Sequence, residues 1–182
     1  MSQFVSFVGG DLGPWEVTRI EPIRGLTLPE FARLQMLSEW IAQPDSQTQM
    51  LLRGVISHLR YTTADELKQL KQTQEGLGRP EAKCAVLIPM KKSEQWWQMP
   101  QDVRRELFEA QSKHTTIGMD YLPAIARQLH HSRDLGEEFD FLTWFEFAPE
   151  YQSQFDELLA RLRATKEWEY VEREVEVRVV WS

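Results

Sequence analysis

The sequence predicts an α+β fold made of two related halves that pack together as one unit. Segments with strand periodicity alternate with segments of helical periodicity. A strand–helix–strand unit occurs near the middle of the chain and again at its C-terminus, and the spacing of these units relates them although they share no obvious sequence identity. No low-complexity segment or flexible linker separates them, which favours one compact fold over two separable domains.

Several segments are expected to be strands because apolar and polar residues alternate along them. They are two short strands within Phe4–Ile23, divided by Gly9-Gly10 and Gly13-Pro14, and single extended segments at 51–59, 83–90, 121–132, 139–147 and 171–181. In the 83–90 strand one side carries Cys84, Val86, Ile88 and Met90, and the other Ala85, Leu87 and Pro89. The last strand has one side made of Val171, Arg173, Val175, Val177, Val179 and Trp181, with mostly charges on the other.

Four segments are expected to be helices. Thr27 and Pro29 open the first, with the apolar stripe Phe31, Leu34, Leu37 and Ile41. Thr63 and Glu66 form a capping box for the second, whose inner stripe is Leu67, Leu70 and Gln74. The third runs from near Pro100 to about His114. The fourth is marked by Phe155, Leu158, Leu159 and Leu162.

Composition and charge limit the kinds of partner. The chain has 182 residues, 42% hydrophobic and 27% charged, which suits a packed globular domain. Its formal net charge of −7 argues against nucleic acid or an anionic membrane surface as a general partner. A single cysteine, Cys84, excludes an internal disulfide and Cys-rich metal sites. No secretory leader or membrane-length apolar run is evident, so a cytoplasmic location is expected.

His114 ends an apolar stripe on the third helix. Val103, Leu107 and Ala110 precede it at helical spacing. A hydrogen-bonded histidine at a helix C-terminus, where a cation is stabilised, is the commoner explanation of such a position. Ligation of a metal or haem iron is the alternative.

Arg127 and Glu167 are two further candidate functional residues. Arg127 shares a face of its extended segment with Pro123, Ile125 and Leu129, so a charge lies among apolar neighbours. An ion pair, or a side chain that extends to solvent, explains such an arginine without any function. Glu167 lies just past the fourth helix, where a solvated turn carboxylate is the common explanation.

Other familiar sites are missing from the sequence. It contains no glycine-rich phosphate loop, no His-Glu-x-x-His helix and no Cys-x-x-Cys-His haem attachment. His130 and His131 are not expected to form a metal site, because adjacent residues on a strand point to opposite faces. Trp96 and Trp97 either line a flat cofactor or fill a core.

Two groups of motifs resemble the chlorite dismutase family. The first consists of Arg60-Tyr61-Thr62-Thr63 and Leu87-Ile88-Pro89-Met90-Lys91-Lys92-Ser93 with Trp96-Trp97. The second is His114, followed thirteen residues later by Arg127, then Leu129-His130-His131-Ser132 and Glu138-Phe139. The resemblance extends from about Gly54 to the C-terminus, and the combination of motifs is specific although each alone is weak. The short chain is similar to the short branch of the family, whose members form dimers.

The resemblance implies a single domain over residues 1–182, with an N-terminal half of about 1–80 and a haem-binding C-terminal half of about 81–182. Two ferredoxin-like halves would form a barrel with outer helices, as one subunit of a homodimer. Each subunit would bind one haem b and act as an oxidoreductase on chlorite. The products would be chloride and dioxygen, with the O–O bond formed through a ferryl/hypochlorite intermediate.

The resemblance also implies roles for single residues. His114 would be the proximal ligand to iron, and Glu167 would accept a hydrogen bond from its imidazole. Arg127 would be the distal arginine, with Gln74 near enough to hold one of its orientations. The remaining positions expected to contact the cofactor are Tyr61, Lys92, Trp96 and Ile88. Of these, Lys92 would neutralise a haem propionate.

Two other functions stay open. Coprohaem decarboxylases share the fold and the proximal histidine, but their pattern has a glutamine in place of Arg127 and a reactive tyrosine in place of Ile88. This chain departs from that pattern at both positions. A non-catalytic haem sensor or carrier on the same fold would need no anion-binding arginine. Peroxide or another oxidant also stays open as the physiological substrate.

Overall fold

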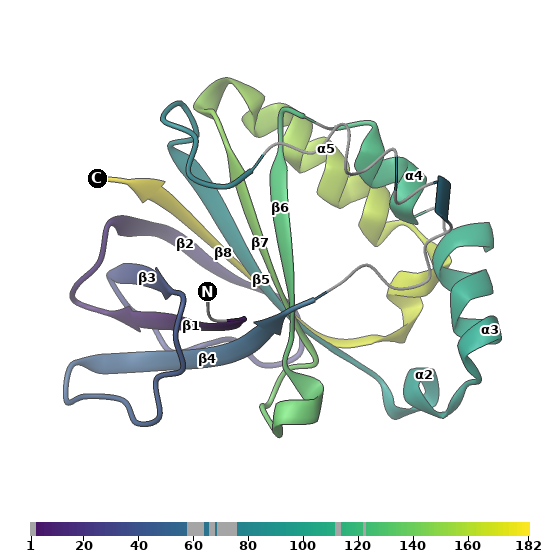
Figure 1. The fold of residues 1–182 in the computed structure, drawn as a ribbon, viewed down its shortest axis with the longest axis horizontal. Coiled ribbons are helices and arrows are strands. Elements are labelled where there is room, and N and C mark those ends of the chain that lie inside the picture. The colour runs from purple at the N-terminus through teal and green to yellow at the C-terminus, as the bar shows by residue number, and fades with distance from the viewer. Residues whose placement is uncertain (1–2, 58–63, 66–67, 69–75, 112–113, 122) are drawn as a thin grey trace.

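A computed structural model of the chain describes residues 3–57, 64–65, 68, 76–111, 114–121 and 123–182. In these residues, strands close into an antiparallel barrel in the order β1-β3-β2-β8-β5-β7-β6-β4, with β4 pairing back to β1. Helices lie outside the strands of the C-terminal half, on the right in Figure 1. The predicted α+β fold, a barrel with outer helices, is confirmed.

The elements follow one another along the chain as strands, then helices, then strands. The barrel strands are β1 (Phe4–Gly10), β2 (Trp15–Arg24), β3 (Arg33–Leu37), β4 (Thr48–Ile56), β5 (Cys84–Lys92), β6 (Ala126–His131), β7 (Phe141–Phe147) and β8 (Val171–Trp181). The helices are α2 (Glu94–Gln98), α3 (Gln101–Arg105), the π-helix η1 (Glu106–Gln111), α4 (His114–Met119) and α5 (Gln152–Arg163). Short 3₁₀ turns are η2 (Arg133–Leu135), η3 (Pro149–Tyr151) and η4 (Lys166–Tyr170).

The N-terminal strands β1–β4 meet the C-terminal strands β5–β8 at two seams. One seam is the long β2·β8 pair, and the other is the short β4·β6 pair. Gly54 allows close approach at the second seam, because a Cβ at this position would lie 2.8 Å from the Cβ of His130.

Two apolar clusters lie on opposite faces of the barrel wall. The inner cluster fills the barrel, and the outer cluster lies between β5, β7 and helix α5. The side chains of β5 alternate between them as the sequence predicts: Ala85 and Leu87 are in the inner cluster, and Val86, Ile88 and Met90 are in the outer one. Separate clusters on the two faces therefore explain why this strand is apolar on both sides.

The expected fourth helix is confirmed as α5, and the last strand is confirmed as β8. The apolar stripe of α5 is buried in the outer cluster: Phe155, Leu158, Leu159 and Leu162. On β8, Val175, Val177 and Val179 enter the inner cluster as predicted. Val171 lies in the outer cluster instead, because the β5·β8 register shifts between Lys91 and Lys92 and reverses the faces at that end.

The helix expected from Thr27 to Ile41 is wrong. Residues Arg33–Leu37 form β3, and Leu34 pairs with Gly9 of β1 and with Trp15 of β2. Apolar spacings of three and four residues match a helix. In the barrel, however, this segment bridges β1 and β2 and obtains its backbone hydrogen bonds from them.

The helix expected from Pro100 to about His114 is confirmed over residues 101–111, where α3 continues directly into the π-helix η1. Residues 112–113 lie outside the described part of the structure, and His114 is the first residue of α4. Of the expected apolar stripe, Val103 on α3 is 37% exposed, whereas Leu107 on η1 is 7% exposed. The helix expected to open at Thr63 and Glu66 lies outside the described residues, apart from helical turns at 64–65 and 68.

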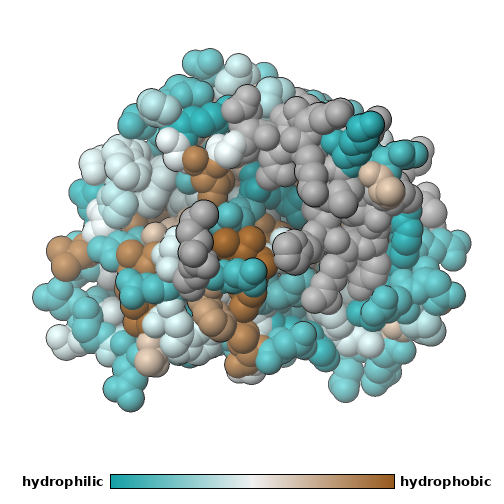
Figure 2. All heavy atoms as spheres, in the orientation of Figure 1, coloured by the Kyte–Doolittle hydropathy of each residue, from teal (hydrophilic) through white to brown (hydrophobic). Residues whose placement is uncertain are grey.

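Hydrophobic residues on the face seen in Figure 2 gather over the strands at its left and centre, and the side of the helices is mainly hydrophilic. The exposed aromatic rings include Phe4 and Trp40, which are 40% and 39% exposed. Their ring centroids lie 5.4 Å apart in an edge-to-face contact. None of the helices described in the structure has the length and apolar character needed to cross a membrane.

Candidate functional site

The strand register places Arg127 and Ile88 on the outer face of the barrel. Arg127 of β6 lies opposite Phe145 of β7, a member of the outer cluster. Ile88 of β5 lies opposite Thr143, two positions before Phe145 on β7. Because directly opposite residues of an antiparallel pair share a face, Arg127 and Ile88 point to the side covered by the helices. Ile88 is buried there.

Arg127 holds a charge in this largely apolar setting. Its side chain is half-buried, and burial lowers the pKa of Arg127 from its ordinary value. The negative charge of Glu167 acts in the opposite direction on the same pKa. The guanidinium stays protonated at neutral pH, because an arginine side chain does not lose its proton in proteins. A fixed cation therefore lies on the outer face, within electrostatic reach of Glu167.

Glu167 is buried, not solvated as its place in a turn suggested. It lies on η4 and is 2% exposed. Its Oε1 lies 2.5 Å from Nζ of Lys92 at the end of β5. The Lys92 ammonium also lies 3.6 Å from the centroid of the fully buried Trp96 ring, which adds a cation–π contact. The charge-assisted hydrogen bond fixes the orientation of the Glu167 carboxylate.

Burial lowers the pKa of Lys92, while the charge and hydrogen bond of Glu167 act to raise it. Asp140 contributes in the same direction as Glu167. Asp140 Oδ2 accepts hydrogen bonds from the backbone N–H of Lys92 at 2.7 Å and from Nε1 of Trp97 at 3.0 Å. Burial in turn raises the pKa of Asp140. Both ends of Lys92 are thus held by carboxylates.

The Lys92–Glu167 pair was not foreseen from the sequence. The two residues are 75 positions apart, so no local spacing indicates the contact. That Lys92 would neutralise a haem propionate stays a prediction, separate from its observed contact with Glu167. The same holds for Trp96 at the haem edge, since the structure shows only that it packs over Lys92 and contacts Tyr170.

The backbone of His114 begins α4, which packs against η1 and α5. The π-helix η1 also packs against η4, the turn that carries Glu167. Glu109 of η1 accepts hydrogen bonds from the backbone N–H and the hydroxyl of Thr116, at 3.4 and 3.3 Å. These bonds tie the first turn of α4 to η1, so η1 links the elements of His114 and Glu167.

Three predicted site positions are not fully described. The side chain of His114 lies outside the described part of the structure, as do Tyr61 and Gln74 altogether. Their roles stay predictions from the family resemblance. Of the predicted site residues that are described, Arg127, Glu167, Lys92 and Ile88 all lie on the helix-covered side of the barrel wall.

His130 and His131 point to opposite faces, as strand alternation predicts. His130 lies inside the barrel with its Nδ1 2.9 Å from the carbonyl oxygen of Leu142, to which it donates. Burial lowers the pKa of His130 to about 4, so it is neutral at pH 7. His131 lies on the other face, with its ring centroid 5.0 Å from that of Phe141.

The predicted site residues, among them His114, Arg127 and Glu167, fit a haem. The outer cluster offers apolar walls for a flat macrocycle, and an imidazole on α4 is a common axial ligand of haem iron. A buried carboxylate such as that of Glu167 is the usual partner for the far nitrogen of such an imidazole. The half-buried cation of Arg127 would suit a small anionic ligand beside such a cofactor.

Comparisons with known sequences agree with this arrangement. A family model described as Chlorite dismutase matches residues 31–180. The curated chlorite dismutase of Ideonella dechloratans is 30% identical over 97 residues, which make up 52% of this chain and 33% of that protein. The match therefore spans about a third of the length of this curated relative.

Solved structures show the same fold. A dimeric chlorite dismutase from Nitrobacter winogradskyi is 48% identical, with a TM-score of 0.89 over 97% of this chain and 99% of that chain. The chlorite dismutase of Candidatus Nitrospira defluvii in complex with imidazole is 26% identical, with a TM-score of 0.62 over 75% of this chain and 56% of that chain. Since the family model covers most of the sequence, this chain belongs to the chlorite dismutase family.

Proposed function

We propose that the protein is a haem-dependent enzyme that decomposes chlorite to chloride and dioxygen. The observation that carries this proposal is the half-buried cation of Arg127, which lies beside the apolar outer cluster and within electrostatic reach of Glu167. In a chain of net charge −7, a local positive group is what can attract a small anion. Family membership and the 48% identity to the Nitrobacter winogradskyi chlorite dismutase support the same activity.

One haem b per subunit would be held in the C-terminal half, on the outer face of the barrel. His114 would bind the iron, and Glu167 would accept a hydrogen bond from its imidazole. Ile88 would form part of the apolar wall, with Tyr61 and Trp96 at the edge. When bound, the haem supplies the electron transfer that breaks the Cl–O bonds of chlorite.

The protein side chains supply orientation and charge. Lys92 donates a charge-assisted hydrogen bond to Oε1 of Glu167, which would orient the carboxylate toward the imidazole of His114. An ionised partner makes the imidazole a stronger electron donor to iron. Arg127 would bind chlorite through charge-assisted hydrogen bonds, and Gln74 would hold one orientation of its guanidinium. The buried surroundings keep water away from these charges, which strengthens each interaction.

The protein is also proposed to be a homodimer. The Nitrobacter winogradskyi relative is described as dimeric and matches this chain over nearly its whole length. The exposed pair Phe4 and Trp40 is an apolar surface that a partner subunit could bury. A cytoplasmic location stays a prediction from the sequence.

Two measurements test the proposal. Haem is titrated into the wild type, His114→Ala and His131→Ala. Tight binding should be lost in His114→Ala and kept in His131→Ala, whose replaced ring packs against Phe141. The haem-loaded wild type should release oxygen from chlorite. Decarboxylation of coprohaem with peroxide, without oxygen from chlorite, would instead assign a decarboxylase, and haem binding with neither reaction would assign a sensor or carrier.

A further inference from the structure

The η4 turn that carries Glu167 is tied to the barrel by hydrogen bonds to side chains of β2 and β8. Nη1 of Arg24, the last residue of β2, donates to the carbonyl oxygens of Trp168 at 2.8 Å and of Val171 at 3.0 Å. Nε1 of Trp168 donates to Oε2 of Glu174 on β8 at 2.8 Å. The residue next to Glu167 is therefore held through both its backbone and its side chain.

Arg24 and Glu174 are a matched pair across the β2·β8 seam. They lie directly opposite each other in the register of the two strands. Opposite residues of an antiparallel pair share a face, so both side chains extend toward the same side of the wall. Here they contact the two ends of one tryptophan residue, its carbonyl oxygen and its indole N–H.

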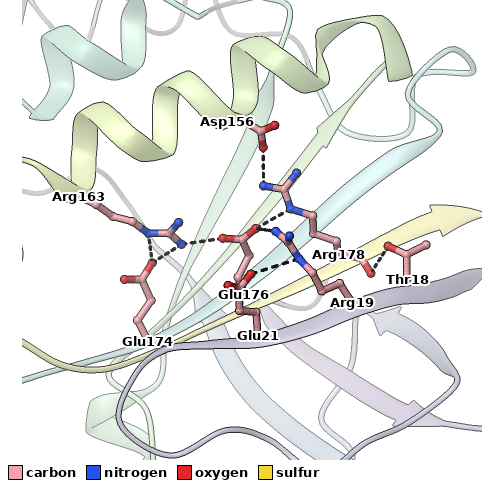
Figure 3. A network of polar contacts seen from close by, with 8 residues as sticks. All are labelled: Thr18, Arg19, Glu21, Asp156, Arg163, Glu174, Glu176 and Arg178. Carbon is pink, nitrogen blue, oxygen red and sulfur yellow. Dashed lines mark hydrogen bonds and ion pairs between the residues drawn. The ribbon is translucent and has the colours of Figure 1, made fainter.

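Glu174 belongs to a network of carboxylates and arginines that is drawn in Figure 3. It is 0% exposed, and its Oε1 accepts hydrogen bonds from Nε and Nη2 of Arg163 on α5, at 3.0 and 2.8 Å. Since Trp168 bonds to Oε2, both carboxylate oxygens are engaged and the group has a single orientation. The neighbouring Glu176, 1% exposed, bonds to Arg19, Arg163 and Arg178 and not to η4.

We infer that Arg24 and Glu174 are positioning residues for Glu167. They fix the η4 turn from the two halves of the barrel, so the Glu167 carboxylate stays within reach of Lys92. On the proposed function, on which this second step rests, the same clamp keeps Glu167 beside the imidazole of His114. The N-terminal half of the barrel, through Arg24, thereby acts on the electron-donating strength of a ligand held by the C-terminal half.

The test compares two pairs of variants of the full chain. Arg24→Gln is matched by Arg19→Gln, on the same strand and bonded to Glu176 instead of η4. Glu174→Gln is matched by Glu176→Gln, on the same strand, equally buried and sharing the partner Arg163. Hydrogen exchange of the amides of residues 166–170 is measured with and without haem. The Fe(III)/Fe(II) potential of the haem-loaded proteins is measured against Glu167→Gln as a reference.

Arg24→Gln and Glu174→Gln should speed exchange in 166–170 by about tenfold or more, because the first removes a charged donor and the second leaves one neutral acceptor oxygen for both Trp168 and Arg163. They should also raise the Fe(III)/Fe(II) potential, as Glu167→Gln is expected to do. Arg19→Gln and Glu176→Gln should leave both the exchange of residues 166–170 and the potential unchanged. Should Glu174→Gln fail to fold, Trp168→Phe removes the same indole N–H and leaves the Arg163–Glu174 pair in place.

If Arg24→Gln and Glu174→Gln show wild-type hydrogen exchange in residues 166–170, the clamp is overturned, regardless of the Fe(III)/Fe(II) potential. Faster exchange with a wild-type potential, when Glu167→Gln does shift it, overturns the positioning role. A wild-type potential in Glu167→Gln itself overturns the proposed contact with His114, and the exchange data then decide the clamp alone.

Discussion

Lys92 and Glu167 form an ion pair in which both side chains are almost fully buried, 5% and 2% exposed, with 2.5 Å between Nζ and Oε1. Taking two charges out of water costs several kcal/mol each, and their attraction recovers this only when the geometry is good. Removal of one partner leaves the other charge buried without it. The pair thus serves to orient Glu167 more than to stabilise the fold.

Lys92→Met should lower the free energy of unfolding by about 3–5 kcal/mol. The double variant Lys92→Met/Glu167→Gln should lose less than the sum of the two single variants, because the second change neutralises the charge that the first strands. Urea unfolding at pH 7 measures all three. Lys91→Met is the control, since its ammonium is half-exposed, lies 3.8 Å from Glu172, and should contribute about 0–1 kcal/mol. Additive losses in the cycle would contradict the coupling.

Arg127→Ala should still bind haem and turn over chlorite, but should release more hypochlorite and inactivate sooner. A half-buried guanidinium can hold an anionic chlorine–oxygen fragment in the site through charge-assisted hydrogen bonds. Arg127→Lys should restore this only partly, because an ammonium lacks the planar fork. Oxygen yield per haem before inactivation is measured with and without a hypochlorite scavenger. If Arg127→Ala has the same oxygen yield and the same scavenger response as the wild type, Arg127 does not retain the chlorine–oxygen fragment.

His130 should make the fold less stable in acid. Its pKa falls from 6.5 to about 4 in the folded protein, so between these values the unfolded chain binds a proton that the folded chain does not. The stabilisation is complete above pH 6.5 and is lost as the pH falls toward 4, by at most roughly 3 kcal/mol. Unfolding free energies of the wild type and His130→Asn from pH 7 to 4.5 should therefore converge. A constant difference over this range would exclude His130 as the source.

The chain should be a homodimer in solution. Light scattering of the full chain is expected to give about twice the mass of one subunit, as in the dimeric relative from Nitrobacter winogradskyi. Phe4→Ser/Trp40→Ser would weaken the dimer if these exposed rings lie in the interface, and Leu12→Ser serves as an exposed apolar control. A monomer or a pentamer for the wild type would contradict the assignment.

Regular periodicity made the C-terminal half readable from the sequence. The alternating sides of β5, the stripe of α5 and the three valines Val175, Val177 and Val179 of β8 lie where their patterns indicate, because each element buries a continuous apolar face. The segment around Leu34 was wrongly predicted to be a helix, because its apolar spacing is helical. In the barrel it forms a strand between β1 and β2. The π-helix η1 has no signal in residue spacing, and Val103 of the expected stripe before it is exposed.

The site was predictable only where a residue stands out in a local pattern. Arg127 stood out because a charge among apolar residues is visible in a local pattern. The burial of Glu167, Glu174 and Glu176 is not visible in this way, because their partners Lys92, Arg163 and Arg19 come from distant segments. Charged residues on alternate positions of β8 look like a solvated face until α5 and β2 are placed against them.

The most direct measurement is an oxygen-electrode trace of the haem-loaded wild type given a known amount of chlorite, with chloride measured at the end. Chlorite contains two oxygen atoms and one chlorine atom, so the account predicts one dioxygen and one chloride for each chlorite consumed. A protein that binds haem through His114 yet leaves chlorite intact, or consumes it without releasing oxygen, would contradict the account.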